Sequence, residues 1–492
     1  MSESDVEAPR AIPRKDADLG DWFRSTLEFG GFVDYNYPLQ GCGVWRGYGW
    51  ALRNHFVEVM RKLLAASGHE EMYFPFLIPE SLIMKEGDFI KGFAPDVYWV
   101  TQGGASSLSE RLAIRPTSET AIYPMFKRWI RTKNDLPLKT WQIVSVFRYE
   151  TKTTRPMTRV REITTFKEAH TAHATYEDAE QQIRQAVAIY KLFFDALGVP
   201  YFVSRRPKFD TFPGADYTLA FDTILPDGKV YQVGTVHNLG YHFSEAFDIQ
   251  YSEPDGSKKR VVQTCYGVSE RAIAAMLYLH GDDHGFVLPP IVAPVQIVIV
   301  PIGDDQDPAV LEYAHTVKTA LSPFWRVELD LRSKRPAWKF YDWELKGVPL
   351  RVEVGPKETR ASKVTAVRRD TFKRASLELS DLQDGVRGLL EALTDDMRAR
   401  AWKINLDRFA ETGAFFQLDG PDAVEKMAAE DDIKASIVRV PFCGDEGCLK
   451  TMWKYVPILG SANALGDGGP SIHGNCCCGK PGIECVQVGR LA

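Results

Sequence analysis

The stretch FRYETKTTRPMTRVRE (147–162) follows the apolar run WQIVSVF and carries four arginines. Residues two apart on a β-strand point to the same face of a sheet, so Arg148 and Glu150 should project together. The same holds for Glu162 and Glu168 on a returning strand. In isolation such a stretch is usually a solvated strand edge with surface ion pairs. The alternative is a charged face, flanked by a Thr/Arg-rich loop, that binds a ligand.

Composition indicates a globular chain. Its 492 residues are 45% hydrophobic, with 60 Lys+Arg against 65 Asp+Glu and a net charge of −5. This length suits two to four domains at roughly 150 residues each, and the near-neutral charge identifies no partner by itself. The N-terminus lacks the apolar core of a secretory signal, and four prolines interrupt the uncharged run from Gly285 to Gly303. We therefore expect a cytoplasmic protein without a membrane span.

The first of three regions, residues 1–288, mixes long helical patterns with strands. Hydrophobic periodicity predicts one helix over 44–67 and another from a cap at Thr175 to Gly198. The run MYFPFLIP predicts a strand, and its Pro75 lacks a backbone donor, which places that strand at an edge or an interface.

The other two regions are smaller. Residues 289–400 alternate strands and helices, which predicts an α/β domain with a mixed sheet. Residues 401–492 hold six of the eight cysteines. The fold class is therefore α/β, with α+β character in the first region.

Four more segments accompany the opening stretch: RPTSET (115–120), YQVGTVHNLGYHFSEAFD (231–248), QTCYGVSERAIAAMLYLHGDDHG (263–285) and WKFYDWELKGVPLRVEVGPKE (338–358). In this order they resemble the signatures of class II aminoacyl-tRNA synthetases, and more narrowly the prolyl-tRNA synthetases of the archaeal and eukaryotic-like type. The resemblance implies a class II antiparallel-sheet catalytic domain at 1–288, an α/β anticodon-binding domain at 289–400 and a small zinc-binding α/β domain at 401–492. It also implies a homodimer that joins L-proline to tRNA(Pro) at the expense of ATP.

The implied reaction explains the arginines. The carboxylate of proline attacks the α-phosphate of ATP and expels pyrophosphate, so positioning and charge neutralisation do the catalysis. Arginine pairs bidentately with phosphate or carboxylate. By resemblance, Arg148 binds the α-phosphate and the substrate carboxylate, and Glu150 contacts the adenine edge. Arg159 or Arg161 holds the distal phosphates or the tRNA end, and Mg²⁺ accompanies the ATP.

The other nucleotide contacts come from two segments. Arg271 stands at a predicted helix start, where free amides and a partial positive charge favour phosphate. Ser269 beside it can donate a hydrogen bond or cap the helix. Gln232 and Thr235 match nucleotide-contacting positions of the family.

Selectivity for proline needs a ring pocket and a partner for the secondary ammonium. By resemblance, Thr117 and Glu119 contact the ammonium, His237 lies against the substrate, and Glu168 is a pocket carboxylate. The segment EITTFKE is about one residue longer than the family's EFLWQE, so the aromatic wall is Phe166 or a shifted neighbour. One methylene gives only ~1–3 kcal/mol of discrimination, so leakage to alanine or cysteine is expected.

Two groups of potential metal ligands stand apart from these motifs. His170 and His173 in EAHTAH have a ligand spacing that suits a helix, but we favour structural roles for them. In a chain without an export signal, CGDEGC and CCCG indicate a four-thiolate Zn²⁺ site that stabilises a small domain. Its predicted ligands are Cys443, Cys448, Cys476 and Cys478, with Cys477 and Cys485 as alternatives.

A basic segment offers a surface for tRNA. Residues 325–374 contain 14 Lys+Arg against 7 Asp+Glu, which fits contact with phosphates. The resemblance to an anticodon-binding domain implies that aromatic side chains here stack on unpaired bases. The candidates are Trp338, Phe340, Tyr341 and Trp343. On composition alone, a basic surface around core aromatics explains the segment as well.

Two other functions stay open from the sequence. One is a synthetase of the same class that serves threonine, serine or glycine. The other is a catalytically silent paralogue that binds tRNA or an amino acid as a sensor. Retention of both arginine clamps, Arg148 and Arg271, argues against the second.

Overall fold

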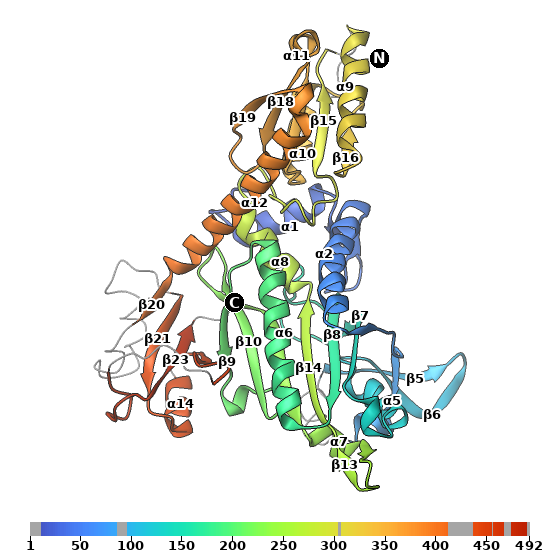
Figure 1. The fold of residues 1–492 in the computed structure, drawn as a ribbon, viewed down its shortest axis with the longest axis vertical. Coiled ribbons are helices and arrows are strands. Elements are labelled where there is room, and N and C mark those ends of the chain that lie inside the picture. The colour runs from blue at the N-terminus through green and yellow to red at the C-terminus, as the bar shows by residue number, and fades with distance from the viewer. Residues whose placement is uncertain are drawn as a thin grey trace.

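The computed structural model describes residues 11–85, 96–303, 307–411, 436–454, 456–466 and 474–489. At its centre stands an eleven-stranded sheet of order β20-β21-β23-β22-β9-β10-β11-β14-β8-β7-β3, with a smaller α/β body above it and the C-terminal strands to one side (Figure 1). The middle strands are β9 (Phe202–Arg205), β10 (Tyr217–Ile224), β11 (Val230–Gly240), β14 (Val262–Ser269), β8 (Glu162–His173) and β7 (Leu138–Phe147). They pair antiparallel throughout, which confirms the predicted catalytic sheet.

Helices cover this sheet and form its main core. α6 (Tyr176–Leu197) crosses it in Figure 1 and packs on β11 and β14, and α2 (Gly47–Ala66) packs on α6. The Thr175 hydroxyl accepts a hydrogen bond from the Asp178 amide at 3.1 Å, and Gly198 ends α6 in the left-handed region with φ 65°. Both predicted helices are confirmed. α1 (Leu19–Phe29) and α8 (Arg271–His280) complete the same core.

The segment EITTFKE contains a β-bulge. Between the pairs Val144–Phe166 and Val146–Ile163, two residues of β8 oppose one of β7. The Glu270 carboxylate accepts hydrogen bonds from both bulge amides, at 2.9 and 3.3 Å, and from the first bulge hydroxyl at 2.8 Å. The bulge is thereby tied to the residue that precedes α8.

Pro75 does not lie within a strand, so the prediction of one continuous strand over MYFPFLIP is wrong. The proline separates β3 (Glu70–Glu71) from β4 (Leu77–Pro79). β3 is the last strand of the large sheet, and β4 is an edge of a separate sheet with β6 (Ser106–Ile114) and β5 (Tyr98–Gly103). Both strands lie at the edge of a sheet, as predicted. Pro75 stands between them, so its missing backbone N–H breaks no hydrogen bond of either sheet.

The α/β body has the predicted mixed sheet, in the order β16-β15-β17-β18-β19. Its strands are β15 (Ile297–Pro301), parallel to β16 (Val327–Leu329) and β17 (Leu350–Val354), then the antiparallel β18 (Lys363–Arg368) and β19 (Arg374–Glu378). Its helices are α9 (Pro308–Leu321), α10 (Pro336–Leu345) and α11 (Pro356–Ala361). A bidentate ion pair from Arg369 to Asp282, at 2.6 and 2.7 Å, joins this body to the end of α8.

The C-terminal strands extend the large sheet. α12 (Leu382–Leu406) passes through the predicted boundary at residue 400 and leads to β20 (Phe409–Glu411). The strands β21 (Ile437–Phe442), β23 (Glu484–Gly489) and β22 (Ile458–Ser461) follow, with α14 (Glu446–Trp453) beside them. Ser461 of β22 pairs with Arg205 of β9, which connects this unit to the catalytic strands.

The remaining elements are short, except for α5 (Glu119–Trp129). They are β1 (Val33–Asp34), β2 (Val44–Trp45), α3 (Glu80–Ile83), α7 (His242–Ala246), β12 (Gln250–Ser252) and β13 (Lys258–Arg260). Within the described ranges, we find no helix with the length and apolar character that crossing a bilayer requires.

Candidate active site

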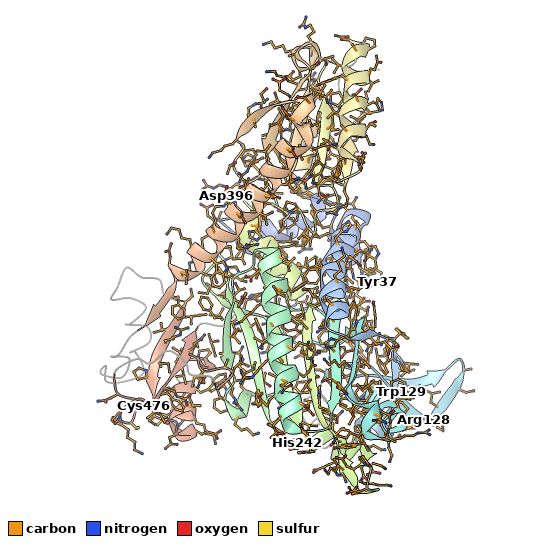
Figure 2. The ribbon with its side chains drawn as sticks, viewed as in Figure 1. Tyr37, Arg128, Trp129, His242, Asp396 and Cys476 are labelled. Atoms are coloured by element: carbon orange, nitrogen blue, oxygen red, sulfur yellow. The ribbon has the colours of Figure 1, made fainter. Side chains whose placement is uncertain are left out.

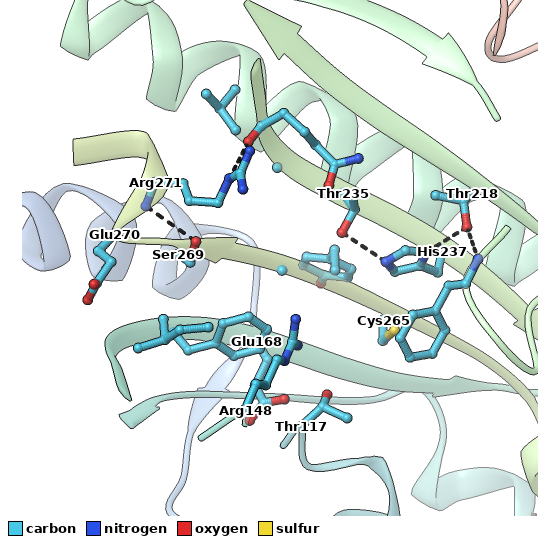
Figure 3. A pocket seen from close by; sticks show the side chains of 18 of the residues that line it. Thr117, Arg148, Glu168, Thr218, Thr235, His237, Cys265, Ser269, Glu270 and Arg271 are labelled. Carbon is cyan, nitrogen blue, oxygen red and sulfur yellow. Dashed lines mark hydrogen bonds between the residues drawn. The ribbon is translucent and has the colours of Figure 1, made fainter. Parts of the chain in front are cut away.

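A cavity of about 590 Å³ lies on the sheet, over β8, β11 and β14. Every residue predicted to bind proline or ATP lines it, apart from Arg161. Figure 3 shows Arg271 at one end, His237 and Cys265 toward the other, and Arg148 on the facing wall. Two arginines more than a hundred residues apart in sequence therefore face the same space.

Arg271 forms the first end of the cavity. Its guanidinium lies 4.0 Å from the ring centre of Tyr231 and donates to the carbonyls of Gln232 at 3.0 Å and Thr158 at 3.2 Å. The Ser269 hydroxyl accepts a hydrogen bond from the Arg271 amide at 3.3 Å. Glu270 is the N-cap of α8, so Ser269 is not its capping residue, and the carbonyl contacts hold the Arg271 guanidinium at the cavity wall.

Arg148 follows the end of β7 and is fixed from two sides. Its Nε donates to the Pro116 carbonyl at 3.1 Å, and its guanidinium lies 5.7 Å from the ring centre of Phe166. Burial lowers its pKa, and the nearby Glu119 carboxylate opposes that shift. The bulge in β8 leaves Phe166 in the cavity wall, so Phe166 is the aromatic residue whose position the sequence left open.

The two loop arginines differ in position. Arg159 lines the cavity, with its Nε 4.0 Å from a carboxylate oxygen of Glu150. Arg161 does not line the cavity: its Nε donates to the Glu150 carbonyl at 3.2 Å, and its guanidinium stacks on Tyr149. Its side chain therefore holds the loop in this structure, and its predicted contact with the distal phosphates or the tRNA end stays a prediction.

Two buried carboxylates face the middle of the cavity. Glu119 accepts a hydrogen bond from the Thr117 hydroxyl at 2.7 Å, and burial raises its pKa. For Glu168, burial favours a higher pKa, but hydrogen bonds from His170, Ser118 and Gln142 outweigh it and hold the pKa below its ordinary value. The cavity therefore keeps a negative charge on Glu168, which suits a substrate cation.

His237 is held between two hydroxyls. Its ring nitrogens lie 2.8 Å from the hydroxyl oxygens of Thr218 and Thr235. Burial lowers its pKa to about 3, so the imidazole is neutral at physiological pH. Phe212, with its ring centre 4.7 Å away, covers one side of it. A neutral ring adds no positive charge that would repel a substrate ammonium.

Among the cavity residues that were not predicted from the sequence are His170, Cys265 and Phe212. A structural role was favoured for His170, and the alternative role as a metal ligand assumed a helix, but His170 lies on strand β8. It stands two residues after Glu168, so strand alternation was an available signal that both face the cavity. His173 is buried on the same strand outside the cavity, hydrogen-bonded to Thr171, as its structural role required. The ligand atoms of Glu119, His170 and Cys265 all lie within 4.8 Å of one another.

The aromatic residues predicted to stack on anticodon bases all fall on α10. Trp343 is only 9% exposed, and its indole N–H donates to Asp330 at 2.7 Å, so its predicted contact with RNA is wrong. Trp338, Phe340 and Tyr341 are all half-buried, and the ammonium of the exposed Lys334 lies 5.3 Å from the ring centre of Trp338. Among the basic residues of this segment, many are held in ion pairs, such as Arg332 with Asp330 and Asp342.

The C-terminal cysteines converge as expected. The sulfur atoms of Cys443, Cys448, Cys476 and Cys478 lie within 4.8 Å of one another. Cys443 is 3.7 Å from both Cys448 and Cys478, close to the ~3.8 Å expected between thiolates at ~2.3 Å on a tetrahedral zinc ion. Cys485 lies on β23, and Cys477 points its sulfur toward the Cys448 carbonyl. The four predicted residues therefore fit zinc. Figure 2 places Cys476 on the side of the sheet away from Trp129.

Comparison with known proteins adds independent information. Residues 98–280 match the family described as the tRNA synthetase class II core domain (G, H, P, S and T), and residues 296–389 match the anticodon binding domain. A proline–tRNA ligase of Methanocaldococcus jannaschii is 48% identical over 426 residues, which is 86% of this chain and 92% of that protein. A proline–tRNA ligase of Methanosarcina mazei is 46% identical over 461 residues, or 93% and 92%.

Solved structures agree with these relatives. The Giardia lamblia prolyl-tRNA synthetase in complex with prolyl-adenylate superposes with a TM-score of 0.91 at 34% identity, covering 99% of this chain and 100% of that one. The Cryptosporidium parvum prolyl-tRNA synthetase complexed with L-proline and AMP gives 0.88 at 29% identity, covering 100% and 99%.

Proposed function

Since the chain belongs to the proline–tRNA ligases, ATP-dependent enzymes of the class II aminoacyl-tRNA synthetases, we propose which residues carry each part of the reaction. The enzyme activates L-proline with ATP to prolyl-adenylate and pyrophosphate, then transfers proline to the 3′ end of tRNA(Pro). One observation carries the assignment: Arg148 and Arg271 line a single cavity together with the carboxylates Glu119 and Glu168.

ATP occupies the end of the cavity formed by Arg271. Arg271 and Arg159 bind the distal phosphates, and Arg148 binds the α-phosphate where the proline carboxylate attacks. Glu150 contacts the adenine edge, while Gln232, Thr235 and Ser269 complete the nucleotide contacts. Mg²⁺ bound with ATP supplies further neutralisation of the leaving pyrophosphate.

Proline occupies the other end. Its secondary ammonium lies between Glu119 and Glu168, with Thr117 donating to Glu119. The neutral His237 and the ring of Phe166 bound the pyrrolidine. Because both carboxylates are nearly inaccessible to water, their attraction for the ammonium is stronger than it would be at the surface.

Only a few side chains of the α/β body are suited to contact the tRNA anticodon. Lys334, Arg335 and Trp338 are the candidates for anticodon contact, because the two cations are exposed and the half-buried Trp338 lies beside Lys334, whereas Trp343 is buried. This assignment follows from exposure and charge, and the division into domains at 1–288, 289–400 and 401–492 belongs to the same proposal.

A homodimer is part of the proposal. Large apolar side chains are exposed on the α2 and α5 side of the catalytic body, where Figure 2 labels Tyr37 and Trp129. They include Tyr37, Leu39, Trp50, Tyr73 and Trp129, with exposed fractions from 40% to 72%. Sedimentation should give about twice the 55.4 kDa chain mass, and a monomer at micromolar concentration would contradict the dimer.

Zinc and location complete the proposal. Zn²⁺ held by Cys443, Cys448, Cys476 and Cys478 would cross-link the C-terminal strands, a structural role without catalytic chemistry. A cytoplasmic location is proposed because charged tRNA is consumed by ribosomes.

Pyrophosphate exchange, measured with each of the twenty amino acids, tests the function. We expect rapid proline-dependent exchange and weak exchange with alanine or cysteine. Exchange with threonine, serine or glycine in place of proline would reassign the substrate. Tight tRNA binding without exchange would identify a silent paralogue.

A further inference from the structure

A second cavity, of about 390 Å³, adjoins the first. Three residues line both: Thr158, Arg159 and Arg271. The remaining wall comes from the start of α1, the turn near Lys229, the loop residue Arg155 and two tyrosines, Tyr231 and Tyr278. The two spaces therefore meet at the residues proposed to hold the distal phosphates of ATP.

The charge of the second cavity favours an anion. Four cationic side chains line it, Arg155, Arg159, Lys229 and Arg271, against the two carboxylates of Asp18 and Asp227. Both carboxylates already have partners. Asp227 lies 3.0 Å from Lys229, and Asp18 accepts the first amides of α1 at 2.9 Å. The excess positive charge therefore comes mainly from the arginines.

Tyr231 supplies an independent sign of a ligand. It is 2% exposed, and its hydroxyl has no hydrogen-bond partner among the described residues. Burial raises its pKa to about 12, so the hydroxyl keeps its proton and can donate. Buried polar groups without partners are rare because they lose their hydrogen bonds to water. An acceptor oxygen in the second cavity would satisfy this donor.

We propose that the second cavity receives pyrophosphate as it leaves the adenylation site. The proposal rests on the proposed function of the first cavity. In activation, a proline carboxylate oxygen bonds to the α-phosphorus, and the bond from that phosphorus to the β-phosphate oxygen breaks. Pyrophosphate leaves with the bonding electrons, and no proton or redox partner is needed. Arg159 and Arg271 contact both spaces, so the anion moves without losing them and gains Arg155, Lys229 and the Tyr231 hydroxyl.

Steady-state pyrophosphate exchange tests the proposal with two variants of residues that line only the second cavity. Tyr231→Phe removes one oxygen and leaves the ring under Arg271, and Lys229→Gln removes one charge. Each should raise the KM for pyrophosphate about 10-fold, the loss expected for one charge-assisted hydrogen bond, and leave the KM for ATP and proline within about twofold. Lys152→Ala, on the same loop as Arg155 but lining neither cavity, is the matched control and should change nothing.

Direct binding separates the possible outcomes. Titration calorimetry of pyrophosphate into enzyme saturated with a sulfamoyl analogue of prolyl-adenylate should show binding to the wild type and weaker binding to both variants. An unchanged KM for pyrophosphate, or an equal rise in the KM for ATP, would overturn the inference. A rise only in the KM for tRNA would reassign the cavity to a tRNA phosphate and overturn it too. If the wild type showed no exchange with proline, the proposed function itself would fail.

Discussion

Arg148 is the side chain at which the two substrates meet. Its guanidinium donates a hydrogen bond to the Pro116 carbonyl and packs against the ring of Phe166, so it is preorganised before either substrate binds. Replacing Arg148 with Ala should lower proline-dependent pyrophosphate exchange on the order of 10²-fold or more, because a fixed positive charge is lost from the attacked phosphate. The exchange rate of Arg148→Lys should lie between those of the wild type and Arg148→Ala, because lysine keeps the positive charge but lacks the planar, bidentate guanidinium. Arg387→Ala, an exposed arginine on α12, should match the wild type. Wild-type exchange in Arg148→Ala would remove this residue from the site.

Glu119 should act on proline and leave ATP unaffected. Glu119→Gln removes a buried negative charge that faces the ammonium, and we expect the KM for proline to rise roughly 10- to 100-fold with little change for ATP. Burial raises the pKa of Glu119, so this carboxylate loses its charge at a higher pH than an ordinary glutamate does. As the pH is lowered, the wild-type KM for proline should therefore begin to rise at that higher pH. Glu177→Gln, exposed on α6, is the control. Parallel increases in the KM for proline and ATP would point to a folding defect instead.

Residue types could be read from the sequence more readily than residue contacts. Arg148, Glu119 and Arg271 were identified because their neighbours in the chain form recognisable segments. Cys265 was not, since a single cysteine in a strand is usually core, and only the pairing of β14 with β8 sets it opposite His170. That register depends on two strands distant in the sequence.

At the scale of elements, β8 combines catalytic and structural work. The length of EITTFKE left the aromatic residue of the cavity wall open between Phe166 and a shifted neighbour, and a β-bulge was not predicted. The structure places the bulge at Thr164 and Thr165, where Glu270 accepts their amides, and this leaves Phe166, Glu168 and His170 in the cavity wall. The continuous strand predicted around Pro75 failed because only Leu77–Pro79 of that run pair as a strand, while β3 lies before it at Glu70–Glu71.

His173 at the end of β8 should make stability depend on pH. Burial lowers its pKa to about 4 and Lys139 adds to the shift, while Asp178 opposes it. The stabilising contribution is complete above pH 6.5 and is lost as the pH falls toward 4, by about 1.4 kcal/mol per pH unit. Urea unfolding at pH 7.5 and 5.5 should therefore show a smaller acid-induced loss for His173→Gln than for the wild type. Equal losses in the two proteins would contradict the assignment.

At the scale of the whole molecule, the C-terminal unit is continuous with the catalytic sheet. The sequence indicated a separate small region, but the strand order runs from β21 through β22 into β9. Arg206, which lines the first cavity, donates to the Leu459 carbonyl at 2.6 Å and to Asp222 at 2.9 Å. Sequence patterns show where strands lie but not which sheet they join, so this link was not foreseen.

Loss of zinc from the C-terminal unit should therefore weaken substrate binding at the active site. Cys443→Ser combined with Cys448→Ser removes two of four converging thiols, so bound zinc should fall from about one per chain to none by atomic emission. The loosened C-terminal strands would free Arg206 from the Leu459 carbonyl, and we expect the KM for proline and ATP to rise several-fold, roughly the loss of one hydrogen bond. Cys477→Ser, whose sulfur lies outside the four, should keep both zinc and kinetics. Zinc loss without any kinetic change would show that the C-terminal unit and the cavity are uncoupled. Zinc loss in Cys477→Ser would show that Cys477 is a zinc ligand in place of one of the four.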